Sequence, residues 1–148
     1  MTGNDSEEAA IVDLKLELVL LPVTDVDRAK EFYLDKVGFN LDVDHRADGG
    51  FRVVQMTPPG SACSVTIGTG ITDAAPGSVR GTHLVVSDIE AARVELRRRG
   101  VDVGEVRHLE SGTWVPGPHP QHNDYESFAD FRDPDGNTWI MQERGYGG

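Results

Sequence analysis

One short pattern occurs twice in the chain and constrains the fold more than any other feature. VTDVDRAKEFYLDKVGF starts at residue 23, and VSDIEAARVELRRRGV starts at residue 86. Thr24 in the first segment and Ser87 in the second each stand three residues before an acidic residue, which is the spacing of a capping box at a helix N-terminus. In both, a glycine follows the expected helix, and glycine favours helix termination. The sequence therefore predicts two helices, over Val26–Val37 and Ile89–Arg99.

Each expected helix lies between β-like segments. The segments Leu14–Val23 and Gly81–Val86 precede the helices. Three further segments follow each helix, FNLDVDHR, FRVVQMTP and CSVTIGT in the first copy and VDVGEVRH, SFADFRDP and NTWIMQE in the second. PPGS and DPDGN supply the turn before the last strand of each copy. The pattern predicts an α+β fold built from two tandem β-α-β-β-β modules.

The two modules are expected to form one domain between flexible tails. The second copy contains an insertion at Leu109–Ser127, where three prolines and the lack of periodicity predict a long loop. A segment rich in Gly, Ala, Pro and Ser connects the copies. We expect a tail over 1–10, a domain over 11–144 and a second tail over 145–148. Within the domain, module one covers 14–68, a linker covers 69–80 and module two covers 81–144.

Composition excludes several classes of partner. The net charge of −11 over 148 residues disfavours a nucleic acid or an anionic membrane surface. The longest apolar run, LVLLPV, is far shorter than the roughly 20 residues of a membrane-spanning helix. The acidic N-terminus lacks the features of a secretion signal, and the single cysteine, Cys63, excludes an internal disulfide framework. We therefore expect a cytoplasmic protein without a nucleic-acid or membrane partner.

A family resemblance rests on three segments at corresponding places in the repeat. PVTDVDRAKEFY, the helix end VGF and the late FRDPDGNTWIMQE together resemble the glyoxalase/bleomycin-resistance/dioxygenase superfamily, also called vicinal oxygen chelate proteins, over about residues 14–143. The resemblance implies that each module forms a curled half-barrel and that two halves enclose a cup for a small molecule. It also implies a homodimer, in which exposed strand edges could pair.

Catalytic members of that superfamily hold a divalent metal in the cup. The resemblance places the metal ligands at Leu18, Thr66, Gly81 and Ile140. Leu, Gly and Ile have no donor side chains, and Thr is a poor ligand. Because alternate residues of a strand face the same side, only a shift of two residues keeps the side chains in the cup. That shift gives Leu20, Gly68, His83 and Gln142. We therefore expect neither a metal nor another cofactor.

The same register predicts a cup lining that is mostly apolar with a few hydrogen-bonding groups, as is typical of small-molecule sites. The expected lining residues are Leu16, Leu18, Leu20, Ser64, Thr66, His83, Val85, Thr138, Ile140 and Gln142. His83 is the one candidate for acid–base catalysis or for a polar contact with a ligand. The alternative is a histidine that is hydrogen-bonded within a dimer interface.

The insertion adds histidines and aromatic residues. HPQH contains two histidines three residues apart but has no companion Cys or Glu pair, so we expect a solvated lid in place of a zinc site. Trp114, Tyr125 and Phe128 either form an aromatic wall over the cup or pack the loop onto the body of the protein. The sequence leaves both alternatives open.

The leading functional hypothesis is a metal-independent protein that binds a hydrophobic or aromatic small molecule, such as an antibiotic. The first alternative is a lyase, isomerase or dioxygenase-type enzyme. Such an enzyme would be metal-free with His83 as acid and base, or metal-dependent through non-standard ligands. A second alternative is a structural or regulatory dimer whose cup is vestigial.

Overall fold

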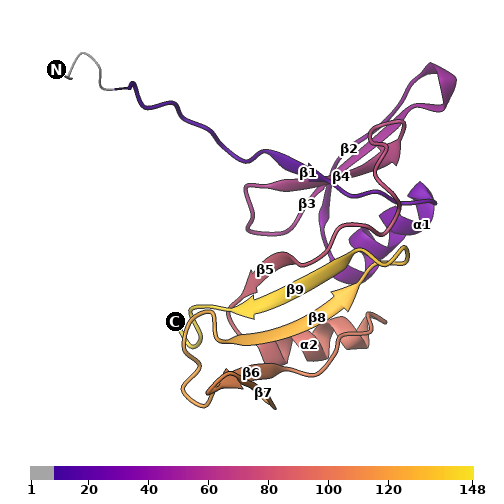
Figure 1. Ribbon diagram of the computed structural model, residues 1–148. Helices are drawn as coiled ribbons and strands as arrows, with labels where there is room; N and C mark the ends of the chain where they lie inside the picture. Colours follow the sequence, from indigo (N-terminus) through magenta and orange to yellow (C-terminus); the bar gives the residue numbers. More distant parts are fainter. Residues whose placement is uncertain (1–8) are drawn as a thin grey trace.

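Two β-sheets, each covered by a helix from its own half of the chain, make up the protein in a computed structural model that describes residues 9–148 (Figure 1). Most of the expected tail over 1–10 therefore lies outside the described residues. The first module contains β1 (Leu18–Leu20), α1 (Val26–Glu31), η2 (Phe32–Val37), β2 (Asn40–Arg46), η3 (Asp48–Gly50), β3 (Arg52–Thr57) and β4 (Ser64–Thr69). The second contains β5 (Thr82–Val86), α2 (Ile89–Arg98), β6 (Arg107–Glu110), β7 (Thr113–Pro116), β8 (Ser127–Arg132) and β9 (Thr138–Glu143).

The two sheets have related topologies. Sheet A has the strand order β1-β4-β3-β2, and sheet B has the order β5-β9-β8-β6-β7. In both, the first strand of the module pairs in parallel with the last one, while the other pairs are antiparallel. The predicted α+β fold of two tandem modules is confirmed, and the sheets do not close into a barrel.

Two predicted segments differ from the structure. The stretch Leu109–Ser127 is not an irregular loop, because β7 forms an antiparallel hairpin with β6. The turn of this hairpin is Ser111-Gly112, whose φ angles of 50° and 79° give the left-handed geometry of a tight hairpin. The first strand is shorter than the expected Leu14–Val23, since only Leu18–Leu20 pair with β4.

The first helix has the expected span but changes type along its length. After Glu31 the backbone widens into the π-helix η2, which ends at Gly38 with φ 99°. Two consecutive side chains at the start of η2, those of Phe32 and Tyr33, are buried in the core. The second helix, α2, ends one residue before the expected Arg99.

The helix caps lie one residue later than predicted. Asp25 accepts a hydrogen bond from the Arg28 N–H, and Asp88 accepts one from the Ala91 N–H, each at 3.0 Å. The Thr24 hydroxyl instead donates to Asp135 Oδ1 at 2.7 Å. The capping-box pattern therefore located both helix starts, while in each helix the aspartate that follows the hydroxyl residue is the cap.

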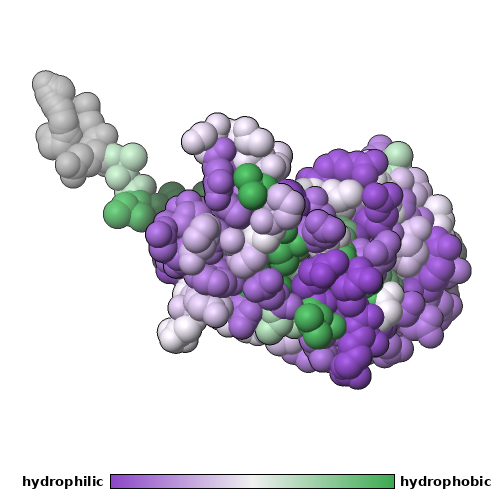
Figure 2. Space-filling view, turned by 90° about the horizontal axis from the view of Figure 1, so that it is seen from below, coloured by the Kyte–Doolittle hydropathy of each residue, from purple (hydrophilic) through white to green (hydrophobic). Residues whose placement is uncertain are grey.

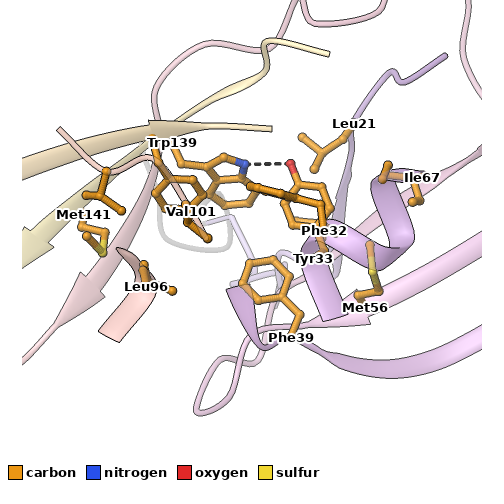
Figure 3. Close-up of a cluster of buried hydrophobic side chains, with 14 of the residues drawn as sticks. Leu21, Phe32, Tyr33, Phe39, Met56, Ile67, Leu96, Val101, Trp139 and Met141 are labelled. Carbon is orange, nitrogen blue, oxygen red and sulfur yellow. Dashed lines mark hydrogen bonds between the residues drawn. The ribbon is translucent and has the colours of Figure 1, made fainter. Parts of the chain in front are cut away.

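A single hydrophobic core joins the modules (Figure 3). Tyr33 and Phe39 of the first module contact Trp139 of the second, with ring centroids 5.8 Å and 5.7 Å apart. Phe131 stacks on the same indole at 6.1 Å. The helix-covered sides of both sheets thus contribute to one core.

The DPDGN turn has a second role beyond reversing the chain. The Asn137 side-chain amide donates to the Pro22 carbonyl at 3.0 Å, at the end of the segment that precedes α1. Tyr33 in η2 donates its hydroxyl hydrogen to Asp133 at 2.8 Å. Burial raises the pKa of Tyr33, and the nearby Asp133 carboxylate raises it further. The turn therefore anchors the second module to the first.

Candidate functional site

The side of each sheet opposite to its helix is its open face, and the predicted cup lining divides between the two open faces. His83, Val85, Thr138, Ile140 and Gln142 lie on the open face of sheet B, and Leu18, Leu20, Ser64 and Thr66 lie on that of sheet A. Leu16 precedes β1 and lies outside the sheet.

The two sets of residues do not meet within the described chain. The helix-covered sides of sheets A and B share one core. Their open faces are therefore turned away from each other. Leu20 is 39% exposed and Val85 is 55% exposed, so apolar side chains on both faces are accessible. One chain thus presents two open faces in different directions.

Strand pairing aligns the open face of sheet B in two rows. Val85, Gln142 and Phe128 are successive partners on β5, β9 and β8, and Phe128 is paired in turn with Arg107 on β6. His83, Ile140 and Asp130 form the neighbouring row. A hollow of about 530 Å³ borders Ile140 and Asp130. The volume is in the range of small-molecule sites.

An aromatic and cationic cluster borders the first row. The Arg107 guanidinium lies over the Trp114 ring, 4.6 Å from its centroid, and 5.9 Å from that of Phe128. The two rings meet edge to face at 5.7 Å. Arg107 also forms an ion pair with Asp130 at 2.9 Å. The pair fixes the guanidinium while Trp114, 49% exposed, remains accessible.

The sequence indicated part of this cluster. Trp114 and Phe128 were expected either to form a wall over the cup or to pack onto the body, and they lie together on or beside the open face. Arg107 and Asp130 lie within the expected strands VDVGEVRH and SFADFRDP but were not predicted as site residues, because the pairing of β6 with β8 brings them together. The Ser-Gly dipeptide between two β-like segments is a hairpin signal that could have located them.

The open face of sheet A is more polar near β3 and β4. The Gln55 amide donates to Ser64 Oγ at 3.3 Å, and the hydroxyls of Ser64 and Thr57 are 2.7 Å apart. Thr57 in turn donates to the Asp42 carboxylate. Among the described side chains, buried Thr66 Oγ1 has no hydrogen-bond partner. This face can offer hydrogen bonds as well as apolar contacts from β1.

His83 is exposed on the open face of sheet B. Its Nδ1 lies 2.6 Å from the Gly81 carbonyl oxygen. Because a carbonyl oxygen can only accept, Nδ1 carries the hydrogen, and in the neutral ring Nε2 is left with a lone pair. His83 can therefore accept a hydrogen bond from a ligand or take a proton from one.

The positions of the family's metal ligands do not fit a metal ion. Leu18 and Ile140 are apolar, and Gly81 has no side chain. Thr66 is the one position of the four with an oxygen donor, and a divalent ion requires several donors. Within residues 9–148, His, Cys, Asp and Glu side chains form no group of three that could hold a metal ion.

The histidines of the insertion are not on a solvated lid. His122 Nδ1 is 2.8 Å from Glu143 Oε1. Glu143, the last residue of β9, is fully buried and accepts a hydrogen bond at 3.0 Å from the N–H of Ile89, the first residue of α2. His119 lies 3.4 Å from Glu126. Tyr125 is close to Arg144, whose guanidinium is 5.8 Å from the ring centroid. The loop therefore packs onto the end of β9.

A further hollow, of about 570 Å³, lies beside the start of α1. One of its lining residues, Arg52, is buried and paired with Asp27 at 2.7 Å and Asp44 at 2.9 Å. Hydrogen bonds from Arg52 lower the pKa of both carboxyl groups. The two carboxylates therefore neutralise Arg52, and Arg46 also borders the hollow. None of the helices in the described part of the chain is long and apolar enough to cross a membrane.

Comparison with solved structures identifies proteins of the same architecture. TnmS3, an antibiotic binding protein from Streptomyces sp. CB03234, is 30% identical, with 90% of this chain and 98% of that chain covered and a TM-score of 0.71. A glyoxalase/bleomycin resistance protein from Streptomyces sp. CB03234 is 32% identical, with 87% and 100% covered and a TM-score of 0.67.

Sequence comparison gives the same grouping. The uncharacterized protein YetH of Bacillus subtilis (strain 168) is 24% identical over 127 residues, and the match covers 84% of this chain and 94% of YetH. The family profile of the Glyoxalase/Bleomycin resistance protein/Dioxygenase superfamily matches residues 15–141, which include both modules. The duplicated β-α-β-β-β unit and these matches agree, and the chain belongs to the Glyoxalase/Bleomycin resistance protein/Dioxygenase superfamily.

Proposed function

We propose that this protein binds and sequesters a small hydrophobic or aromatic molecule, such as an antibiotic, without a metal cofactor. The observation that carries the proposal is the cluster of Trp114, Phe128 and Arg107 at the open face of sheet B. A large aromatic side chain that remains accessible beside apolar neighbours is typical of a binding surface. The similarity to TnmS3, an antibiotic binding protein, supports a ligand of this class.

The chemistry of the face favours a planar ligand with a few polar groups. An aromatic ring can stack against Trp114, where its apolar area is removed from water. Gln142 and His83 lie on the same face and supply hydrogen-bonding groups. The net charge of −11 favours a neutral or cationic molecule over an anion.

We also propose that the protein is a homodimer and that each cup is composite. The open face of sheet B in one protomer would lie opposite the open face of sheet A in its partner. The reason is that the two faces are turned away from each other within one chain, although both carry accessible apolar residues. Two-fold pairing would give two equal cups. A monomeric mass by light scattering at micromolar protein concentration would contradict this arrangement.

Calorimetric titration with known compounds tests the binding function. Doxorubicin and metal-free bleomycin are cationic compounds that contain aromatic rings, and kanamycin is a cationic compound without one. In EDTA-containing buffer we expect the first two to bind and to raise the melting temperature without being converted, while kanamycin does not bind. Absence of binding by both aromatic compounds would count against the proposal.

A matched pair of variants assigns the binding to the cluster. Trp114 and Tyr125 come from the same inserted segment and are each 49% exposed. Trp114→Ala should weaken binding about tenfold, equivalent to about 1.4 kcal/mol. Tyr125→Ala should leave it unchanged, because Tyr125 lies near Arg144. Equal effects of the two changes would remove Trp114 from the site.

The lone pair on His83 Nε2 favours one second candidate, a metal-free lyase or isomerase with His83 as acid and base. In that case the bound compound would be converted, and His83→Ala would abolish turnover while binding persists. Chromatography of the compound after incubation with the protein separates the two functions. Recovery of unchanged compound supports sequestration.

We further propose that the chain acts in the cytoplasm as one domain, with modules over 14–68 and 81–144. The single cysteine, Cys63, is suited to a reducing compartment. The shared core supports treating the modules as one domain.

A further inference from the structure

A row of four side chains crosses the open face of sheet A. Thr66 on β4 is paired with Leu20 on β1 and with Gln55 on β3, and Gln55 is paired with Val43 on β2. On the face of the molecule that Figure 2 shows, hydrophilic residues predominate and apolar residues form small patches. Leu20 is 39% exposed and Val43 is 44% exposed, so both ends of the row are apolar and accessible. An aromatic ring that contacts both ends would cover the polar pair between them.

A chain of hydrogen bonds connects Gln55 to a carboxylate. The hydroxyl of Thr57 donates its one hydrogen to Asp42. In the 2.7 Å contact between Thr57 and Ser64, the hydrogen therefore comes from Ser64. Ser64 Oγ then has no hydrogen left to donate, and it accepts from Gln55 Nε2 at 3.3 Å. Every hydrogen in the chain points towards Asp42.

The order of these hydrogens fixes the orientation of the Gln55 amide. Because Ser64 can only accept, the amide nitrogen has to face Ser64, and the carbonyl oxygen Oε1 is turned away from the chain. Gln55 is half-buried, so its side chain is not closed off from the open face. It therefore presents an acceptor that is suited to a hydrogen-bond donor on a ligand.

Thr66 supplies a second polar group beside Gln55. Thr66 is 3% exposed, and among the described side chains its Oγ1 is a buried atom without a hydrogen-bond partner. Such a group is costly unless a ligand or water satisfies it. Residues directly opposite each other on neighbouring strands have Cβ atoms about 5 Å apart, so one ligand group can reach both side chains. Leu20 borders Thr66 on the other side, and a change of its rotamer would admit that group.

A hydroxyl group on the ligand matches both residues at once. Its hydrogen can be donated to Gln55 Oε1, while its oxygen can accept from the Thr66 hydroxyl. An ether or a ketone has no hydrogen to donate and would leave Gln55 Oε1 without a partner. The pair is therefore selective for a hydroxyl group.

From this row and the ordered chain beside it, we propose that Gln55 and Thr66 select aromatic ligands that carry a free hydroxyl group, and that Thr57 and Ser64 position the Gln55 amide for this contact. The inference rests on the proposed function. It adds the class of ligand, a hydroxylated aromatic compound, and it assigns the recognition of the hydroxyl group to sheet A, while the Trp114 cluster of sheet B contacts the ring.

Two planar coumarins that differ in one hydrogen-bond donor test the selectivity. Umbelliferone carries a hydroxyl group where herniarin carries a methoxyl group. In mildly acidic buffer, where umbelliferone keeps its phenolic hydrogen, fluorescence titration should show that umbelliferone binds about tenfold more tightly than herniarin. Gln55→Met should bring this ratio close to one, whereas Gln121→Met, at an exposed position of the inserted segment, should leave it unchanged. Equal binding of the two coumarins by the wild type, or an unchanged ratio in Gln55→Met, would overturn the proposal.

Thr57→Val tests the positioning role separately, because valine keeps the shape of threonine and removes its hydroxyl. Ser64 would then be released to donate to Gln55 Oε1, and the amide nitrogen would turn towards the ligand. The ratio should therefore shift in favour of herniarin, which can still accept a hydrogen bond. Melting temperatures without ligand show whether both variants are folded. An unchanged ratio in folded Thr57→Val would refute the positioning role.

Titration of the wild type with doxorubicin and metal-free bleomycin separates this inference from the proposed function. Binding of either compound without binding of umbelliferone would contradict the selection of a hydroxyl group and leave the proposed function intact. If neither they nor the coumarins bind, the proposed function is contradicted, and the inference that rests on it fails as well.

Discussion

The hydroxyl of Tyr33 donates a hydrogen bond to Asp133 Oδ2 at 2.8 Å and accepts one from Trp139 Nε1 at 2.9 Å, and Figure 3 shows the second of these bonds. Tyr33 lies in η2 of the first module, and its two partners belong to the second. A buried polar chain thus crosses a core that is otherwise aromatic and aliphatic. It specifies how the modules pack, because a shifted arrangement would leave these groups without partners.

Tyr33→Phe should lower the free energy of unfolding by about 1–3 kcal/mol, since it leaves the Asp133 carboxylate and the Trp139 N–H with fewer partners in a buried site. Urea denaturation measures the change. The exposed Tyr125→Phe is the control and should have almost no effect. A loss below about 0.5 kcal/mol for Tyr33→Phe would show that water satisfies the released groups.

Gly77 is expected to be the least replaceable glycine of the linker. It has φ 77°, and a Cβ there would be 2.1 Å from the Asp135 carbonyl oxygen. Gly77→Ala should therefore destabilise the fold by about 2 kcal/mol or more, because both strain and backbone displacement contribute.

Gly112→Ala separates these two contributions. Gly112 has φ 79°, but a Cβ there would have no neighbour within 4 Å. Its replacement should cost only the conformational strain, about 1 kcal/mol. Thermal denaturation of both variants tests the difference, and equal losses would show that the contact at Gly77 relaxes freely.

His83→Ala should weaken binding of an aromatic ligand by about 0.5–3 kcal/mol while the melting temperature stays near that of the wild type. The imidazole is exposed, so its removal costs little packing. Calorimetry with the ligand found in the binding screen provides the measurement. Unchanged affinity would leave the pocket in place but exclude His83 from it.

The stability of the β6–β7 hairpin, which carries Trp114, should depend on pH. The Glu110 hydrogen bond, with a further bond to the Gly117 carbonyl, raises the pKa of His108 above its ordinary value of 6.5. The raised pKa means that the protonated ring contributes stability that is fully present below pH 6.5. This contribution is lost as the pH rises through the folded-state pKa, because neutral His108 cannot donate to both acceptors.

Proton NMR of the histidine ring signals between pH 5 and 9 measures the effect, with His108→Gln used to assign the resonance. Loosening of the Trp114 side chain should follow the same titration. A His108 pKa at or below 6.5 would contradict the expectation.

Local chemistry explains why the helices could be predicted closely. The acidic and hydroxyl residues at each start and the glycines Gly38 and Gly100 act on their own neighbours, so the spans of α1 with η2 and of α2 follow from short segments. Even there, the cap of each helix is the aspartate after the expected hydroxyl residue. Thr24 is engaged by Asp135 more than 100 positions away, which no local pattern could reveal.

The candidate site was predictable only in part, because pairing register is a property of two segments at once. Alternation placed His83 and Val85 on one face correctly, since a strand has period two. The neighbours of that face were harder to predict. Arg107 reaches Trp114 only through the hairpin at Ser111-Gly112, and the prolines nearby concealed the strand signal. The orientation of one open face relative to the other depends on the shared aromatic core and is not encoded in any single strand.

The orientation of the open faces also has a genetic consequence. In the proposed homodimer, a lesion on the open face of sheet A and a lesion on that of sheet B damage opposite walls of a cup. When two such defective chains form a mixed dimer, both lesions fall in the same cup and the other cup is fully wild-type. Two inactive alleles should therefore complement each other when they are expressed together, at one intact site per mixed dimer. A cup formed within a single chain could not be rescued in this way.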